Sequence, residues 1–227
     1  MLIDDYHLQS DETLKTKSVV KMFLRDYVAT GDQVAVVFTS GAKGQDMTSD
    51  GSLLLSAVDR LRGQFDANVP IGVVETTALS VLHTARDISL DLSASGGAVR
   101  KAIVFFSAGI GCAPGAAPST PGGTLWCGSG MTDTVRAAAG GNVTLYAIDP
   151  RGSRNPAWAR ASAETGGSAS GAGSQVRPGA GRPVSNFLDG MHALADETGG
   201  FSLRNSDDFK NAFERITLDM SQYYLLG

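Results

Sequence analysis

The chain has 227 residues, of which 42% are hydrophobic, and a formal charge of −4 from 19 basic and 23 acidic residues. This length suits one globular α/β domain. The weak negative charge argues against a nucleic-acid footprint or a polybasic membrane patch, and no apolar run reaches the roughly 18 residues of a membrane-spanning helix. We therefore expect partners among proteins, small molecules or metal ions, without direct membrane insertion.

The first ten residues carry the main functional signal. A short apolar run, Met1–Ile3, is followed by Asp4 and Asp5 and then by a helix start expected at Ser10. A buried parallel strand delivers its last residues to the carboxyl edge of an α/β sheet, where ligands bind. We interpret Asp4 and Asp5 as the centre of such an edge.

Apolar spacing predicts strands that alternate with helices. Short runs rich in Val, Ile and Phe predict strands at residues 1–3, 33–39, 47–48, 102–106, 143–148 and 201–203. Apolar residues at helical spacing predict helices at 10–30, 52–61, 76–88, 132–139, 184–197 and 206–216. The alternation predicts a Rossmann-like, doubly wound and mostly parallel sheet flanked by helices, in one domain over 1–227.

Local signals place the helix ends. Ser10 and Ser206 are expected N-caps, and Asp207 and Asp208 are expected in the first turn of the last helix. Leu14 is expected to face the core with the apolar stripe of the first helix. Residues 63–74 are expected to be irregular, with 71–74 extended.

Two long loops, 107–130 and 149–183, leave predicted strands at the same edge as Asp4. Within the second, residues 152–183 are dominated by Gly, Ser, Ala, Arg and Pro, so we expect a mobile segment. Cys112 and Cys127 lie in the first loop and are either free thiols or a disulfide of about 3 kcal/mol, which would suit an exported protein. The chain begins almost inside a strand and ends on an apolar run, so we expect further chain on both sides.

Six stretches in order carry a resemblance to a known family: LIDDYHLQS (2–10), GDQVAVVFTSG (31–41), RKAIVFFSAGI (100–110), NVTLYAIDPRG (142–152), ALADETGGF (193–201) and ITLDMSQYYLLG (216–227). They resemble the von Willebrand factor type A fold, and more closely the bacterial VWFA-related family known from Acidobacteria. The resemblance implies an exported, periplasmic or cell-envelope protein with a protein-binding or adhesion role.

Type A domains commonly hold a divalent cation through Asp-x-Ser-x-Ser after the first strand, a later Thr and a later Asp. Asp4 matches the first position, or Asp5 if the strand is one residue longer, and Thr77 or Thr76 matches the threonine. The chain departs from the pattern elsewhere. Tyr6 and Leu8 stand at the serine positions, or His7 and Gln9 in the shifted register, and Ala108 stands where the last Asp is expected.

The resemblance therefore implies a degenerate metal-ion-dependent adhesion site formed by Asp4, Asp5 and Thr77. Such a site would bind Mg²⁺ or Mn²⁺ weakly or not at all. An imidazole ligand at His7 would favour a transition metal. The alternatives for these residues are structural: the two acids cap a loop or helix start, and Thr77 is the N-cap of its helix.

Four further residues are candidate partner contacts at the same edge: His7, Ser107, Trp126 and Trp158. The two tryptophans either anchor a partner or pack their own loops. We expect a non-enzymatic protein-binding module. One alternative is a hydrolase, but the sequence has no G-x-S-x-G signature and no His/Asp pair linked to Ser107 by spacing. A second alternative is a phosphoacceptor receiver domain, but the sequence lacks the Lys that such a domain requires after a late strand.

Overall fold

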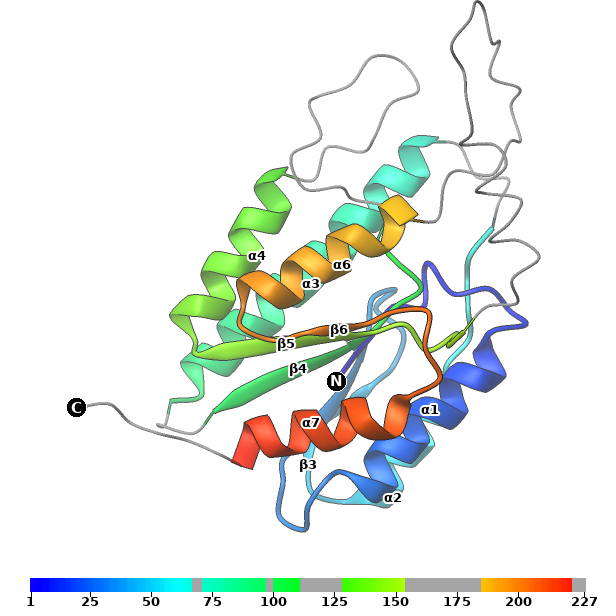
Figure 1. Ribbon diagram of the computed structural model, residues 1–227. Helices are drawn as coiled ribbons and strands as arrows, with labels where there is room; N and C mark the ends of the chain where they lie inside the picture. Colours follow the sequence, from blue (N-terminus) through cyan, green and yellow to red (C-terminus); the bar gives the residue numbers. More distant parts are fainter. Residues whose placement is uncertain (67–70, 97–99, 111–127, 154–184, 222–227) are drawn as a thin grey trace, which may run out of the picture.

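A computed structural model describes residues 1–66, 71–96, 100–110, 128–153 and 185–221. Its centre is a six-stranded sheet in the order β3-β2-β1-β4-β5-β6 (Figure 1). The strands are β1 (Leu2–Ile3), β2 (Val34–Phe38), β3 (Gln45–Thr48), β4 (Lys101–Phe106), β5 (Val143–Ile148) and β6 (Ser202–Leu203). All neighbours pair in parallel except β2 and β3, which are antiparallel. The predicted mostly parallel, doubly wound sheet is confirmed.

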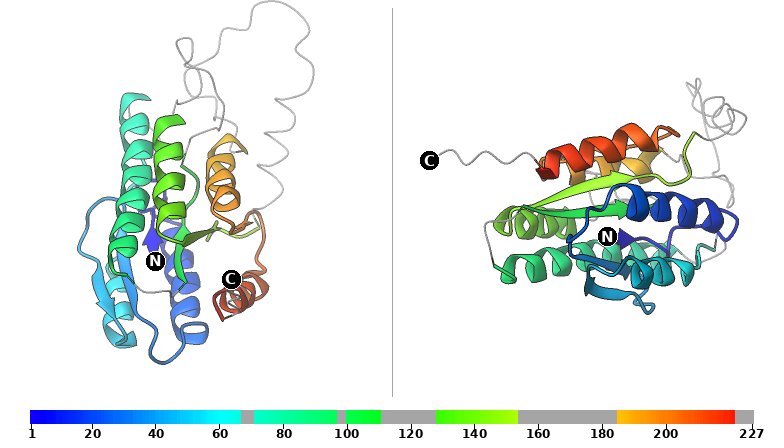
Figure 2. Two further views of the ribbon diagram at one scale, coloured as in Figure 1. Left: turned by 90° about the vertical axis from the view of Figure 1, so that its left-hand side faces the viewer. Right: turned by 90° about the horizontal axis from the view of Figure 1, so that it is seen from below.

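Within the described residues, six helices cover the two faces of the sheet, as Figures 1 and 2 show. One face carries α1 (Thr13–Asp26), α2 (Gly51–Asp59) and α7 (Phe209–Ser221), and the other carries α3 (Ile71–Ala94), α4 (Gly128–Gly140) and α6 (Ser185–Glu197). Two apolar clusters fill the space between helices and sheet. Because successive strand residues point to opposite faces, Leu2 joins the α3–α4–α6 cluster and Ile3 joins the α1–α2–α7 cluster.

The start of α1 differs from the prediction. The helix begins at Thr13 rather than Ser10, because residues 10–12 form a turn in which the Glu12 carboxylate accepts a hydrogen bond from the Gln9 N–H at 3.1 Å. The buried face then runs through Thr13, Thr16, Val20 and Phe23, at three- and four-residue spacing. Leu14 is 75% exposed, so its predicted place in the core was wrong.

Helices α3 and α7 also differ from the sequence reading. Residues 71–74, expected to be extended, form the first turn of α3, so Thr77 lies inside the helix instead of capping it. Its hydroxyl donates to the Val73 carbonyl at 3.1 Å. Helix α7 begins at Phe209, so Asp207 and Asp208 precede it rather than occupy its first turn. The Ser206 hydroxyl instead accepts from the Asp208 N–H at 3.1 Å.

Candidate functional site

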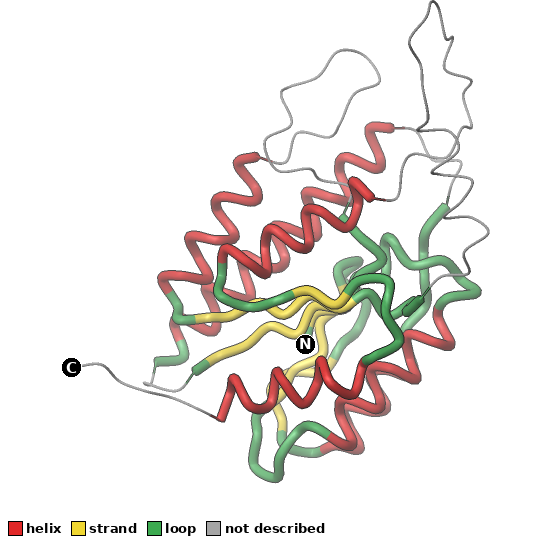
Figure 3. The backbone as a smooth tube through the Cα atoms, viewed as in Figure 1, coloured by secondary structure: helices red, strands yellow, loops and turns green. Residues whose placement is uncertain are grey.

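The carboxyl ends of four parallel strands place polar side chains at one edge of the sheet. Asp4 and Asp5 follow β1, Thr39 follows β2, Ser107 follows β4 and Asp149 follows β5. All five are buried, with exposed fractions of 4% or less. The strands end together because they are parallel and adjacent, so residues distant in sequence meet here (Figure 3). We call these five residues and His7 the edge cluster.

Asp4 is the centre of the edge cluster. One carboxylate oxygen lies 2.6 Å from the Ser107 hydroxyl and 2.8 Å from Nδ1 of His7. The other accepts from the Thr39 hydroxyl at 3.1 Å and from the His7 N–H at 3.3 Å. Both oxygens are therefore occupied by donors of the chain itself.

His7 supplies the opposite charge. Burial alone would raise the pKa of Asp4, but the charge and hydrogen bonds of His7 and the hydrogen bond from Ser107 outweigh it and lower that pKa. Burial alone would lower the pKa of His7, but the charge and hydrogen bond of Asp4 outweigh it and raise that pKa. The pair is therefore best described as an ion pair. Nε2 of His7 is buried without a hydrogen-bond partner among the described residues.

Asp5 is held by neutral donors. The Ser40 N–H and hydroxyl lie 2.9 and 2.5 Å from its carboxylate, Nε2 of Gln64 lies at 2.9 Å, and the Thr39 hydroxyl lies at 3.0 Å. The Gln64 N–H also donates to the Asp5 carbonyl at 2.8 Å. The Thr39 hydroxyl carries one proton, so it donates to Asp4 or to Asp5 at a given moment. Asp5 thus fastens the segments that follow β1, β2 and α2.

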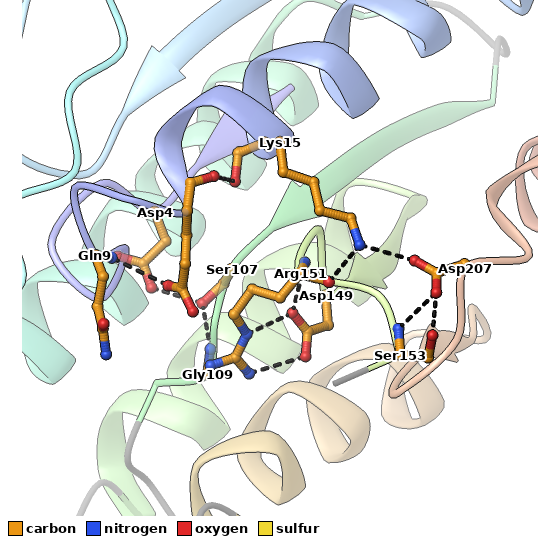
Figure 4. Close-up of polar contacts among 11 residues, drawn as sticks. Asp4, Gln9, Lys15, Ser107, Gly109, Asp149, Arg151, Ser153 and Asp207 are labelled. Atoms are coloured by element: carbon orange, nitrogen blue, oxygen red, sulfur yellow. Dashed lines mark hydrogen bonds and ion pairs between the residues drawn. The ribbon is translucent and has the colours of Figure 1, made fainter. Parts of the chain in front are cut away.

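A second group of contacts extends the edge toward α1 and α7 (Figure 4). Arg151 binds the buried Asp149 carboxylate with two nitrogens, at 2.7 and 2.8 Å. Lys15 of α1 donates to the Arg151 carbonyl at 2.7 Å and to Asp207 at 2.8 Å. Hydrogen bonds from Lys15 and Ser153 lower the pKa of Asp207 to about 2. The segment after β5 is therefore tied to α1 and to the segment that precedes α7.

Comparison with known proteins finds a match among solved structures. No family model and no curated protein matches the chain. A solved structure of an aerotolerance-related membrane protein from Bacteroides fragilis NCTC 9343, carrying multiple mutations to serines, is 14% identical with a TM-score of 0.54. The alignment covers 97% of this chain and 96% of that one.

The two chains share one fold. At this identity the match shows the architecture alone, which is consistent with a von Willebrand factor A-like domain of Rossmann type. Among the helices of the described ranges, none is both long and apolar enough to cross a membrane.

The edge cluster does not fit the divalent cation that the resemblance implies. At the two serine positions, Tyr6 packs against the α3–α4–α6 cluster and Leu8 is 1% exposed in the opposite cluster. The Thr77 hydroxyl donates within α3, and the described residues contain no group of three His, Cys, Asp or Glu that could hold a metal. Asp4 and Asp5 already accept hydrogen bonds on all four oxygens, so a hard cation would have to displace them. A cation site at Asp4, Asp5 and Thr77 stays a prediction.

The remaining candidate residues divide in two. His7 and Ser107 belong to the edge cluster and are 7% and 1% exposed, so they hold the edge from within. Trp126, Trp158, Cys112 and Cys127 lie outside the described residues, as do most of 107–130 and the predicted mobile segment 152–183. Sequence reasoning missed Thr39, Ser40 and Gln64, although Thr39 is the last residue of a predicted strand and Ser40 directly follows it. It also missed Lys15, because nothing in the sequence relates this residue to Arg151 or Asp207.

Proposed function

We propose that this chain is a non-enzymatic protein-binding module of an exported or cell-envelope protein, which engages its partner at the carboxyl edge of the sheet without a divalent cation. The observation that carries the proposal is the edge cluster. Its buried hydrogen bonds join the segments after β1, β2 and β4, and residues farther along the first two of these segments, 9–11 and 41–43, are exposed. A rigid support under exposed segments is what a recognition surface requires.

The contacts of Ser107 support the non-enzymatic reading. Its hydroxyl donates to Asp4 and accepts from the Gly109 N–H at 2.9 Å. In a serine hydrolase the histidine stands between the serine and the acid. Here Asp4 stands between Ser107 and His7, and its lowered pKa makes it a weak proton acceptor. The similar structure is described as a membrane protein, which supports an envelope location for the proposal.

The exposed residues after β1 offer a test that leaves the edge cluster intact. Asp11 is exposed between β1 and α1, at the carboxyl edge, whereas Asp91 is exposed near the end of α3, close to the opposite end of the sheet. We expect Asp11→Arg to reduce capture of an envelope protein by the immobilised domain at least tenfold, and Asp91→Arg to leave capture unchanged. Capture reduced equally by both variants, or by neither, would contradict a binding surface at this edge.

A further inference from the structure

Helix α6 and strand β6 bring together a serine, a histidine and an aspartate outside the edge cluster. His192 and Asp196 are four residues apart on α6, so their side chains lie one turn apart on the same face. After α6 the chain turns at Gly199, where φ is 77°, and runs back beside the helix as β6 (Figure 1). Ser202, the first residue of β6, thereby comes next to His192.

The His192 ring is held at both of its nitrogens. Nδ1 lies 3.0 Å from the Ser202 hydroxyl oxygen, and Nε2 lies 3.2 Å from Oδ2 of Asp196. A neutral imidazole carries one N–H and one lone pair, and a hydroxyl either donates or accepts. Ser202 therefore stays bonded to Nδ1 whether or not that nitrogen carries the proton. When Nδ1 carries it, the lone pair of Nε2 is free to bind a metal ion.

The spacing of Nε2 and Oδ2 matches two ligands of one metal ion. Nitrogen and oxygen ligands lie about 2.1 Å from zinc, so they are about 3.0 Å apart at a right angle and about 3.4 Å apart at a tetrahedral angle. The observed 3.2 Å between His192 and Asp196 lies between these values. A metal ion between the two atoms displaces the proton of Nε2, which passes to water.

Both ligands are accessible from solvent. The side chains of His192 and Asp196 are 44% and 55% exposed. The described residues supply no third His, Cys, Asp or Glu ligand, so the other coordination positions are open to water. Arg204, two residues beyond Ser202, is paired with Asp189 at 3.2 Å, so its positive charge is compensated. The Ser202 hydroxyl supplies the outer hydrogen bond that orients histidine ligands in metal sites.

The contacts of these three residues differ from those of a hydrolase triad. In such a triad the serine bonds Nε2 of the histidine, and a buried acid bonds Nδ1. Here the two nitrogens are exchanged, and Asp196 is exposed. An exposed carboxylate beside Nε2 favours a metal ion over a reactive serine.

We infer that α6 and β6 form a surface site for a divalent transition metal of the zinc class. Nε2 of His192 and Oδ2 of Asp196 bind the ion, Ser202 orients the imidazole through Nδ1, and water fills the remaining positions. A mixed nitrogen and oxygen pair favours Zn²⁺ or Cu²⁺ over Mg²⁺ and Ca²⁺, which prefer oxygen ligands. None of the three residues belongs to the edge cluster, so this site is independent of the binding proposed at the carboxyl edge.

His83 provides a matched control within the chain. It is exposed on α3 with Asp87 four residues later, the same spacing as His192 and Asp196. Asp87, however, is bound by two nitrogens of Arg86, at 2.9 and 2.7 Å, and among the ion pairs of the described residues none joins it to His83. Spacing alone would make the two pairs equal, whereas the contacts predict a metal at His192 only.

Addition of Zn²⁺ to the EDTA-treated and dialysed protein, followed by nitrogen NMR of the histidine rings, tests the proposal. We expect Zn²⁺ to shift the Nε2 resonance of His192 and to leave that of His83 unchanged, and Mg²⁺ to shift neither. Asp196→Asn should weaken Zn²⁺ binding by roughly tenfold or more and Ser202→Ala by about tenfold, whereas Asp87→Asn should leave it unchanged.

The substituted residues lie at the surface, so each variant should keep the thermal midpoint of the wild type in EDTA, which confirms that it is folded. A His192 ring that excess Zn²⁺ leaves unchanged, or equal shifts at His192 and His83, would overturn the proposal. Binding that survives Asp196→Asn undiminished would overturn it as well. Wild-type binding by folded Ser202→Ala would overturn the orienting role of Ser202.

Discussion

Asp4 and Asp5 show how two adjacent acids are accommodated in the interior. An isolated buried carboxylate is strongly disfavoured, and the penalty falls when hydrogen bonds and an opposite charge compensate it. Asp4 receives the charge of His7 together with two hydroxyls, whereas Asp5 receives a backbone N–H, an amide and hydroxyls. The chain thus supplies for itself what a bound cation would otherwise supply.

The ion pair predicts a pH window for stability. Because the pKa of Asp4 is lowered from its ordinary 3.8, its contribution is present above pH 3.8 and is lost as pH falls through the lowered value. Because the pKa of His7 is raised from 6.5, its contribution is complete below pH 6.5 and is lost as pH rises through the raised value. His7→Gln should therefore cost most, about 3–5 kcal/mol, between pH 3.8 and 6.5.

Urea unfolding of the wild type and of His7→Gln, from below pH 3.8 to well above pH 6.5, measures this pH dependence. The difference between the two proteins in free energy of unfolding should shrink above pH 6.5. A difference that grows as the pH rises would show that neutral rather than charged His7 is the stabilising form.

Ser107→Ala tests the hydroxyl contact. The substitution removes a hydrogen bond to a buried carboxylate and the acceptor of the Gly109 N–H, so we expect a loss of about 2 kcal/mol in the free energy of unfolding. Ser95→Ala is the matched control, because its hydroxyl is exposed and donates to the Leu92 carbonyl, and we expect a change within about 0.5 kcal/mol. Equal effects in chemical denaturation would argue against a special role for Ser107.

At the scale of elements, β6 is positioned by a close backbone approach. The segment after α6 passes β5 so closely that a Cβ on Gly200 would lie 1.8 Å from the Leu145 carbonyl oxygen. The Gly200 N–H also donates to the Ala195 carbonyl at 2.8 Å, which ends α6. A glycine at this position therefore allows α6 to turn directly into the edge strand.

Gly200→Ala should separate β6 from β5. We expect a loss of about 1–3 kcal/mol in the free energy of unfolding, because the backbone has to shift to make room. Gly140→Ala, at the end of α4, has no atom within 4 Å of the new Cβ and should be neutral or slightly stabilising. Thermal unfolding compares the two, and an unchanged midpoint for Gly200→Ala would show that the approach is easily relieved.

At the scale of the whole molecule, the sheet could be predicted from sequence and the site only in part. Runs such as 102–106 and 143–148 are almost continuously apolar, as expected of strands covered on both faces, and were predicted as strands for that reason. The position of Asp4 and Asp5 at the carboxyl edge follows from parallel strands. The hydrogen-bond donors to Asp4 and Asp5 could not be assigned from the sequence, because Ser107 and Gln64 reach these carboxylates only through tertiary packing. The first turn of α3 was missed because Ile71–Val74 is rich in β-branched residues, a preference that the fold overrides.

Hydrogen-bond donors of the chain itself and the charge of His7 compensate the buried carboxylates of Asp4 and Asp5, without a cation. Thermal unfolding in EDTA and then with Mg²⁺, Mn²⁺ or Ca²⁺ tests it, with Asp4→Asn as the matched variant. We predict the same midpoint in all four conditions. A cation that binds the native state, present at a concentration of about 100 times its dissociation constant, would add roughly 2.7 kcal/mol to the free energy of unfolding. It would raise the midpoint by roughly 5–10 °C. Such a rise in the wild type, absent in Asp4→Asn, would contradict the account.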